Sequence, residues 1–380
     1  MNVPRDPTAV KRVMIMAAGT GGHIFPGLAI AQCMRGRGWD CSWLGTLHGM
    51  ERDLVPRHAI PMESLDFSGM RGKGLRHSVT GAFKLVASFW RCFQILKRVR
   101  PDVVVGMGGY VTLPGGLMAR LLGIPLVLVN ADAALLLSTK LLMPCADRVL
   151  LGLPMSTNAA PSVAPVSDTS TKHAKLCVTG NPIREDICQL PDPASRFSGR
   201  TGPLRIMVVG GSLGAMILNT TVPAALALLS KEQRPVVTHQ SGKKHMAALT
   251  SAYAAAGVEA EIVDFIDNMP QRYATVDLVI CRAGAITVSE LTAAGVASLL
   301  VPFMASSTTH QRQNASWMTQ HHAAIDLPQT EMTAHKLASI ITTLTRDKCL
   351  EMAQAAYTLG QRQATAQIAD VLEQSVRKLV

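Results

Sequence analysis

Residues 17–26 of this 380-residue chain read Ala17-Ala-Gly-Thr-Gly-Gly-His23-Ile-Phe-Pro26, and they decide the fold. They follow the apolar run Val13–Met16, which is short enough to be a buried strand. Proline is favoured at the first position of a helix, so we predict a strand, a glycine loop and a helix that begins at Pro26. Such a loop lets backbone N–H groups approach an anion at the positive end of the helix.

A histidine distinguishes this loop from the dinucleotide-binding fingerprint, whose third glycine is replaced here by Ile24. The imidazole of His23 is the only side chain of the loop that can move a proton near pH 7. We therefore predict a functional site around Gly19–His23. The alternative is a tight turn in which the histidine only packs.

Composition indicates a globular protein of two domains with an acidic partner. The length exceeds one ordinary core, 48% of the residues are hydrophobic and 17% are charged. The net charge of +11, from 37 basic and 26 acidic residues, favours a phosphorylated substrate, an anionic membrane surface or nucleic acid. Nucleic acid is the least favoured, because only 4% of the residues are aromatic and no binding motif appears.

Cysteine spacing predicts neither a zinc cluster nor a disulfide framework, since the eight cysteines form no CxxC pair. We expect a reducing, cytosolic compartment. The polar stretch Met1–Pro7 lacks the apolar core of a signal peptide, and no apolar run reaches the roughly 18 residues of a spanning helix. Membrane contact is therefore expected to be peripheral.

Short apolar runs alternate with helical patterns, which is typical of parallel sheets with right-handed crossovers. The strands expected in the first half are 13–17, 40–44, 103–106, 125–129, 147–151 and 175–179. The pattern restarts with the strands 204–209, 236–240, 261–265, 278–281 and 298–301, and helical patterns follow at 332–345 and 347–379. We predict two α/β halves that join near residues 180–186, with ligands outside the carboxyl ends of the strands.

Two further glycine loops have the same pattern as residues 17–26. Gly106–Gly116 combines a preceding strand, glycines and a proline near a helix start, which predicts a second anion site in the first half. Gly210–Gly214 is the counterpart in the second half, where Ser212 can donate to a phosphate oxygen. The alternatives are glycines that only permit close packing and a serine that only caps a helix.

Polar residues follow two later strands of the second half. Glu290 is placed early in a helix that starts near Ala285, where the dipole favours a carboxylate and where it can chelate a diol. The amides of Gln311 and Asn314 suit the hydroxyls of a sugar. The alternative for Glu290 is that it only complements the helix dipole. The alternative for Gln311 and Asn314 is that they are polar loop residues without a role.

A basic and apolar segment covers residues 69–100, in which the stretch Gly69–His77 leads into Phe83–Arg100. It mixes Phe83, Phe89, Trp90 and Phe93 with lysines and arginines, which predicts a surface that binds anionic lipid. The alternative is an amphipathic helix whose apolar face packs on the core and whose basic face is exposed to solvent.

Seven motifs in this order resemble a family of bacterial peptidoglycan synthesis, the undecaprenyldiphospho-muramoylpentapeptide β-N-acetylglucosaminyltransferases. The motifs are Gly19–Pro26, Gly106–Tyr110, Gly180–Arg184, Gly210–Gly214, His239–Lys243, Asp264–Asp267 and Cys281–Glu290. The resemblance implies an α/β fold of the GT-B type, with two Rossmann-like doubly wound domains facing a cleft. Residues 1–183 would form the acceptor and membrane-facing domain, residues 184–360 the UDP-GlcNAc domain, and a last helix at about 361–380 would pack back on the first.

The implied reaction is the transfer of N-acetylglucosamine from UDP-GlcNAc to the 4-hydroxyl of the MurNAc unit of lipid I, with inversion, giving lipid II. No cofactor or metal is implied. The resemblance places the protein peripherally on the cytoplasmic face of the inner membrane, with anionic lipids and other cell-wall synthesis and division proteins as partners and no nucleic acid.

The resemblance also assigns residues. His23 is the candidate general base, and the diphosphate of lipid I would meet Gly106, Gly108, Gly109 and Tyr110. Membrane contact falls to Phe83, Phe89, Trp90 and Phe93. Glu290 would hold the ribose and Ile266 would lie by the uracil. The full donor set is Thr20, Gly21, Gly22, Asp132, Arg184, Ser212, Ile266, Ala285, Ile286, Thr287, Val288, Ser289, Glu290 and Gln311.

The segment 129–132 departs from the family pattern, since Val-Asn-Ala-Asp stands where His-Glu-Gln-Asn is frequent. Leu213 and Ala283 replace a glutamine and a serine. Two alternatives remain open: another UDP-sugar enzyme of this fold, such as a UDP-GlcNAc 2-epimerase, and a weakly active membrane scaffold. Turnover that requires a lipid acceptor distinguishes the transferase from both.

Overall fold

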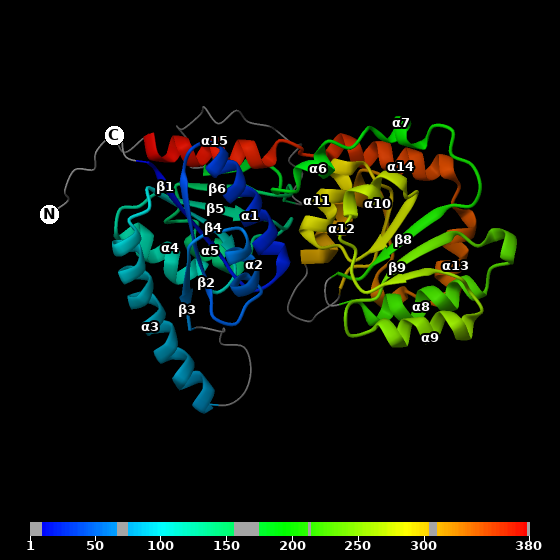
Figure 1. The fold of residues 1–380 in the computed structure, drawn as a ribbon, viewed down its shortest axis with the longest axis horizontal. Coiled ribbons are helices and arrows are strands. Elements are labelled where there is room, and N and C mark those ends of the chain that lie inside the picture. Colours follow the sequence, from blue (N-terminus) through cyan, green and yellow to red (C-terminus); the bar gives the residue numbers. More distant parts are fainter. Residues whose placement is uncertain (1–9, 67–74, 156–174, 212–213, 304–309, 378–380) are drawn as a thin grey trace. The chain divides into compact units, whose positions relative to one another are not determined.

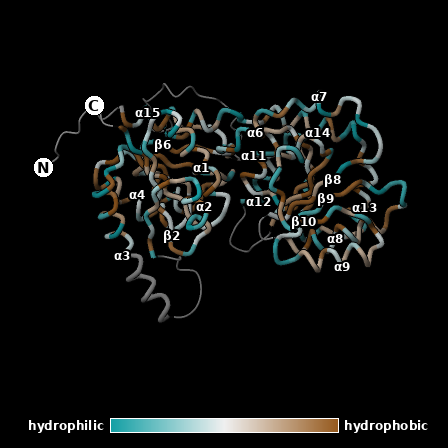
Figure 2. The backbone as a smooth tube through the Cα atoms, in the orientation of Figure 1, coloured by the Kyte–Doolittle hydropathy of each residue, from teal (hydrophilic) through white to brown (hydrophobic). Residues whose placement is uncertain are grey.

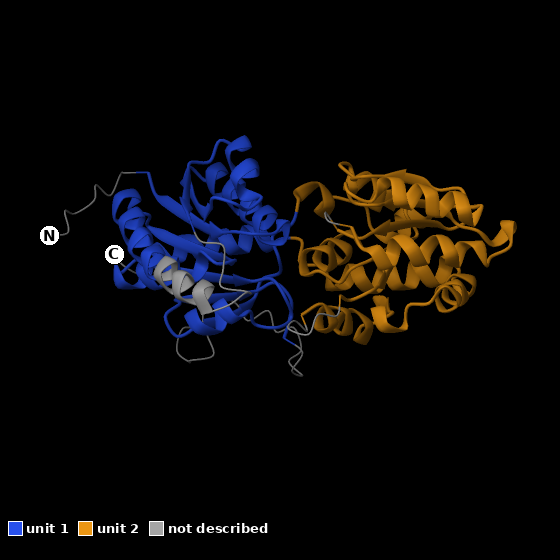
Figure 3. Ribbon diagram, turned by 90° about the horizontal axis from the view of Figure 1, so that it is seen from below, with its two compact units in different colours: residues 1–183, 363–380 blue, residues 184–362 orange. Residues whose placement is uncertain are grey.

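The structure is a computed structural model that describes residues 10–66, 75–155, 175–211, 214–303 and 310–377. The chain divides into two compact units, residues 1–183 with 363–380 and residues 184–362 (Figure 3). Each unit contains one parallel β-sheet with helices packed on it (Figure 1). The predicted α/β fold with two doubly wound sheets is confirmed.

The N-terminal unit has a seven-stranded sheet in the order β3-β2-β1-β4-β5-β6-β7. Its strands are β1 (Arg12–Ala17), β2 (Asp40–Thr46), β3 (Met62–Leu65), β4 (Val103–Gly108), β5 (Leu126–Asn130), β6 (Arg148–Leu151) and β7 (Leu176–Val178). Its helices are α1 (Gly21–Gly36), α2 (Glu51–Arg57), α3 (Leu75–Val99), α4 (Thr112–Leu121), α5 (Leu137–Leu142) and the C-terminal α15 (Ala364–Arg377).

Strand β1 lies in the middle of this sheet and is buried on both faces. Val13 and Ile15 pack with α1 and α15, whereas Met14 and Met16 pack with α3, α4 and α5. A strand covered on both faces reads as a continuous apolar run, which is why residues 13–17 were recognisable without alternation. Figure 2 shows the central strands as hydrophobic segments inside the helices.

The C-terminal unit has a six-stranded sheet in the order β10-β9-β8-β11-β12-β13, with α8, α9 and α13 against one face. Its strands are β8 (Arg205–Val209), β9 (Val236–Gln240), β10 (Glu261–Val263), β11 (Leu278–Cys281), β12 (Ser298–Leu300) and β13 (Ala324–Asp326). Its helices are α6 (Glu185–Cys188), α7 (Pro193–Phe197), α8 (Met216–Ala227), η2 (Lys231–Gln233), α9 (Met246–Ala256), α10 (Met269–Thr275), α11 (Ala285–Ala294), α12 (His310–Gln320), η3 (Gln329–Glu331), α13 (Ala334–Thr343) and α14 (Arg346–Leu359).

The helical pattern expected over 347–379 corresponds to two helices, α14 and α15, which Gly360 separates. A Cβ atom at Gly360 would lie 2.6 Å from the carbonyl oxygen of Thr292, so the chain passes α11 too closely to continue as a helix with side chains. The break lets α15 join the N-terminal unit, where Asp370 pairs with Arg37, the residue that follows α1, at 2.6 Å.

Candidate functional site

The glycine loop after β1 leads directly into α1, and His23 lies in the first turn of that helix. The N–H of His23 donates to the carbonyl of Thr20 at 3.0 Å, and the helix begins at Gly21. The prediction that it begins at Pro26 is therefore wrong. Pro26 is the sixth residue of the helix, where its missing N–H leaves out one backbone hydrogen bond. The earlier start fixes the backbone that carries His23.

The loop after β4 packs against His23. A Cβ atom at Gly108 would lie 2.7 Å from Cε1 of the imidazole, and Gly108 has a φ of +115°, which favours glycine. Gly109 is likewise too close to the backbone of Ala18 for any side chain. The structure thus brings the candidate base and the glycines of the candidate acceptor loop together, while Tyr110 at the end of the loop is exposed.

The environment of His23 suits a proton acceptor. Burial lowers its pKa below the ordinary value of 6.5, while the charge of Asp132 and a hydrogen bond with the Met107 backbone oppose that shift. Nδ1 is buried and has no hydrogen-bond partner in the part of the chain that the structure describes. A lowered pKa leaves the imidazole neutral at pH 7, which is the form that a general base needs.

Asp132, whose charge acts on His23, lies in a loop that two asparagines hold. The side-chain Nδ2 of Asn130 donates to the carbonyls of Asp132 at 2.8 Å and Ala134 at 3.0 Å. Asn181 donates to the carbonyl of Ala131 at 2.9 Å. The sequence analysis did not identify the roles of these asparagines, because a bond from a side chain to loop backbone, whether local as for Asn130 or 50 residues away as for Asn181, leaves no periodic signal.

Glu290 is the centre of the polar cluster in the C-terminal unit. The hydroxyl of Tyr273 donates to Oε2 at 3.2 Å, and Nη2 of Arg184 lies 3.5 Å from Oε1. Burial raises the pKa of Glu290, opposed by Arg184 and Tyr273. Glu290 is the sixth residue of α11, beyond the first turn, so the dipole argument for this residue is wrong. Arg184 and Tyr273 hold the carboxyl group instead.

Gln240, which the sequence analysis missed, connects two loops of the same unit. Its Oε1 accepts from the N–H of Ile266 at 3.1 Å, and its Nε2 donates to the carbonyl of Gly211 at 3.1 Å. The candidate uracil residue Ile266 is thereby fixed relative to the glycine loop 210–214. Ser212, the predicted phosphate donor of this loop, lies outside the described residues.

The remaining donor candidates follow β11 and β12. The run from Ala285 to Glu290 forms the first six residues of α11, which starts after Gly284 at the carboxyl end of β11. Gln311 accepts the N–H of Phe303 at 2.8 Å through Oε1. Asn314 donates to the carbonyl of Ala283 at 3.0 Å, so it holds the loop before α11.

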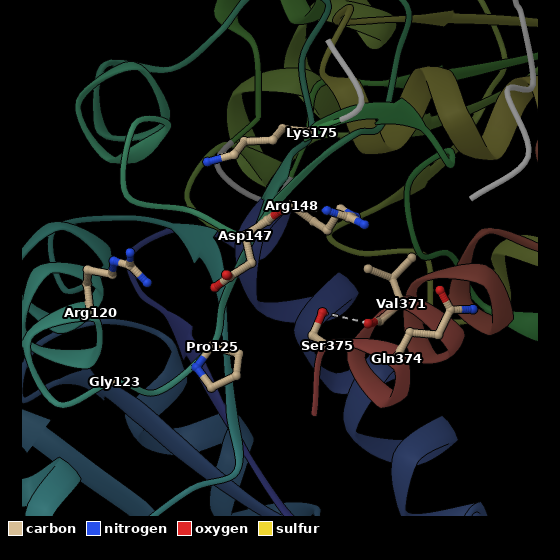
Figure 4. Close-up of a pocket in the computed structure, with 9 residues that line it drawn as sticks. All are labelled: Arg120, Gly123, Pro125, Asp147, Arg148, Lys175, Val371, Gln374 and Ser375. Atoms are coloured by element: carbon tan, nitrogen blue, oxygen red, sulfur yellow. Dashed lines mark hydrogen bonds between the residues drawn. The ribbon is translucent and has the colours of Figure 1, made fainter. Parts of the chain in front are cut away.

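A cavity of about 300 Å³ lies away from these loops, in the N-terminal unit (Figure 4). Its lining comes from the amino ends of β5 and β6, the end of α4 and the helix α15, and includes Arg120, Asp147, Arg148, Lys175 and Gln374. Ligands of doubly wound sheets bind at the carboxyl ends of strands, so this cavity is not the candidate site.

No cluster of three or more His, Cys, Asp or Glu side chains that could hold a metal ion is found among the described residues. Within the same residues, no helix has the length and apolar character to cross a membrane.

Comparison with known proteins defines the class. Residues 13–151 match the glycosyltransferase family 28 N-terminal domain, and residues 205–373 match the glycosyltransferase family 28 C-terminal domain. Together with the two parallel sheets and their carboxyl-end loops, these matches define a glycosyltransferase of the GT-B fold, as predicted.

The relatives specify the family. The UDP-N-acetylglucosamine--N-acetylmuramyl-(pentapeptide) pyrophosphoryl-undecaprenol N-acetylglucosamine transferase of Janthinobacterium sp. (strain Marseille) is 62% identical over 97% of this chain and 99% of its own length. The crystal structure of Acinetobacter baumannii MurG matches with a TM-score of 0.81 and 35% identity, covering 96% of this chain and 99% of that one. The chain belongs to this family of N-acetylglucosamine transferases, which confirms the resemblance seen in the motifs.

A UDP-GlcNAc 2-epimerase from Neisseria meningitidis, solved with UDP-GlcNAc, also has this fold. It matches with a TM-score of 0.63 and 12% identity, over 96% of this chain and 100% of that chain. At that identity the likeness extends to the fold alone.

Proposed function

We propose that this protein transfers N-acetylglucosamine from UDP-GlcNAc to the 4-hydroxyl of the MurNAc unit of lipid I, with inversion, to form lipid II. The observation that carries the proposal is a half-buried histidine packed against a glycine loop, in a chain that is 62% identical to a transferase of that name. Most of the residues assigned to the donor belong to the C-terminal unit. The candidate base and the residues assigned to the acceptor belong to the N-terminal unit.

The donor is assigned mainly to the C-terminal unit. Glu290 accepts hydrogen bonds from the ribose hydroxyls, and Ile266 lies by the uracil. The N-terminal N–H groups of α11 and the hydroxyl of Ser212 bind the diphosphate, whose charge a helix N-terminus stabilises. Arg184 and Gln311 complete this set. Thr20, Gly21, Gly22 and Asp132 are the donor residues that the N-terminal unit contributes.

His23 is assigned as the general base that accepts the proton of the acceptor hydroxyl. As that proton passes to the imidazole, the hydroxyl oxygen attacks the anomeric carbon of GlcNAc and the bond to the UDP oxygen breaks. Attack opposite the leaving group inverts the anomeric configuration. Gly106, Gly108, Gly109 and Tyr110 bind the diphosphate of lipid I through the backbone of their loop. This arrangement places the base beside the acceptor loop, as the packing of Gly108 on His23 supports.

The proposal is tested by incubating the purified protein with UDP-GlcNAc, with and without a lipid I analogue, and determining the product linkage. We expect UDP release only with the acceptor, and a β-1,4-linked disaccharide. Epimerisation or hydrolysis of UDP-GlcNAc without an acceptor would support the epimerase alternative instead. Binding of vesicles without any turnover would support the scaffold.

The pH profile gives a second test of His23. Because the charge of Asp132 raises the His23 pKa, Asp132→Asn lowers that pKa further below 6.5. The base then stays neutral to lower pH, so the acidic limb of the kcat/KM profile moves to lower pH. Steady-state kinetics from pH 5 to 8 measures the shift, with the exposed Asp53→Asn as control. A limb that stays in place, or moves to higher pH, contradicts the assignment.

We further propose that α3 and its neighbours bind the anionic inner leaflet from the cytoplasmic side. Val86 and Trp90 of α3 are 68% and 63% exposed, and Leu121 at the end of α4 is 69% exposed. The rings of Trp90 and Phe93 stack at 5.7 Å, Phe89 is half-buried, and basic residues of α3 such as Arg91 are exposed. Apolar insertion beside basic residues is the pattern of an interfacial surface. Phe83 lies among residues whose side chains are outside the described structure.

Replacing Phe89 and Trp90 with serine should weaken binding to phosphatidylglycerol vesicles about 100-fold or more, because each aromatic ring contributes roughly 1.5–3 kcal/mol when buried and 1.4 kcal/mol corresponds to a factor of about ten. Co-sedimentation with vesicles measures the loss. Leu228→Ser, which removes an apolar residue that is 49% exposed in the other unit, serves as the control. Undiminished binding of the double variant would contradict the assignment of this face to the membrane.

A further inference from the structure

The carboxylate of Glu51 joins the loops that follow β1 and β2. Glu51 is the first residue of α2 and is fully buried. Its Oε2 accepts the N–H of Gly19 at 3.1 Å. Its Oε1 accepts the N–H of Thr46 at 2.9 Å and the hydroxyl of Thr46 at 2.6 Å. The three donor groups therefore belong to Gly19 in the loop after β1 and to Thr46, the last residue of β2.

The sequence around β2 leaves room for this carboxylate. A Cβ atom at Gly45 would lie 2.7 Å from Cγ of Glu51, and one at Gly49 would collide with the carboxylate itself. The hydroxyl of Thr46 also accepts the N–H of Gly49 at 3.1 Å, so it relays between that backbone and Glu51. A buried carboxylate is costly unless its oxygens are hydrogen-bonded, and here both are.

The bond to Gly19 acts on the segment that carries His23. Gly19 has a φ of +101° and immediately precedes Thr20, whose carbonyl accepts the N–H of His23 at 3.0 Å. A shift of the Gly19 amide therefore moves the first turn of α1, and with it the imidazole. The contact between His23 and Gly108 leaves little room for such a movement.

We infer that Glu51 is a positioning residue for catalysis, which holds the glycine loop so that His23 meets the acceptor hydroxyl. The inference rests on the proposed function, because it acts through the assigned base. Glutamine at this position keeps the shape but replaces one acceptor oxygen with an NH₂ group, which would face an N–H donor of Gly19 or of Thr46. Glu51→Gln therefore loosens the loop with little change in volume.

Amide hydrogen exchange tests the structural part without any substrate. We expect the amides of residues 19–24 to exchange about tenfold or more faster in Glu51→Gln, because bonds to charged acceptors are the stronger ones. Asp53→Asn removes an exposed carboxylate from the same helix and should leave exchange unchanged. Equal exchange in Glu51→Gln and the parent protein would overturn the inference.

A double-mutant cycle tests the catalytic part. Glu51→Gln should lower kcat for transfer to the lipid I analogue by about 100-fold, the scale of a misplaced catalytic group. In the His23→Ala background the same change should cost less than about twofold, because residues that act as a unit are not additive. Equal losses in both backgrounds, or an unchanged kcat, would overturn the inference.

The inference can still be tested if Glu51→Gln does not fold or if the parent protein shows no transfer. If Glu51→Gln does not fold, Thr46→Val removes one of the three donors and should lower kcat by a smaller factor, of about three to ten, again only when His23 is present. An unchanged kcat in this variant counts against the inference. If the parent protein shows no transfer at all, the proposed function fails, while the exchange experiment still decides whether Glu51 holds the loop.

Discussion

Replacing His23 with alanine is expected to lower kcat by about 100- to 10,000-fold, the usual contribution of a general base. The affinity for UDP-GlcNAc should change little, because the imidazole is assigned to the acceptor proton and not to the nucleotide. Burial lowers the pKa of His23, so the neutral base is already present at pH 7 and its loss is not masked by protonation. Turnover with the lipid I analogue and donor binding by calorimetry measure the two effects separately.

A matched control is available on the same unit. His48 has a side chain that is 65% exposed and lies 3.7 Å from Asp66. His48→Ala should therefore leave turnover within about twofold of the parent protein, since surface substitutions away from a site have small effects. Turnover above half of the parent value in His23→Ala would remove the general-base assignment, and another group would have to accept the proton.

The sequence was sufficient for those parts of the fold that depend on local pattern. The fully buried runs of β1 and β4 are continuous stretches of apolar residues, and glycine loops follow them, so the strands and the loops were predicted together. Strands β3 and β13 were missed because Glu63 and Ser64 in the first and Asp326 in the second leave no continuous apolar run.

The site residues, too, could be predicted where they lie in a local sequence pattern and were missed where they act over a long separation in the chain. His23, Arg184 and Glu290 lie in motifs that are readable from residue type and order. Glu51 and Gln240 were missed because each acts through bonds to a backbone 26 or more residues away along the chain, which no local spacing records. The start of α1 was misplaced for a related reason. Pro26 is a favoured helix start, but the carbonyl of Thr20 already accepts two N–H groups of the turn before it.

Glu290→Gln is expected to raise the Kd for UDP-GlcNAc by about 10- to 100-fold, because a hydrogen bond to a charged group contributes roughly 1.5–3 kcal/mol. The carboxyl group is only 15% exposed and is held by Tyr273 and Arg184, so it is fixed before the ribose arrives. Because burial raises its pKa, donor binding should weaken as the pH falls through a value above that of an ordinary glutamate.

A donor without the ribose 2′-hydroxyl tests whether this loss comes from the ribose. If Glu290 accepts that hydroxyl, 2′-deoxy-UDP-GlcNAc should bind the parent protein weakly, and Glu290→Gln should weaken its binding much less than that of UDP-GlcNAc. Glu259→Gln, an exposed glutamate of the same unit, controls for the loss of a charge. An equal penalty for both donors would mean that Glu290 acts elsewhere, by holding Arg184 and Tyr273 in place. The comparison thus separates a residue that binds the nucleotide from one that only supports its neighbours.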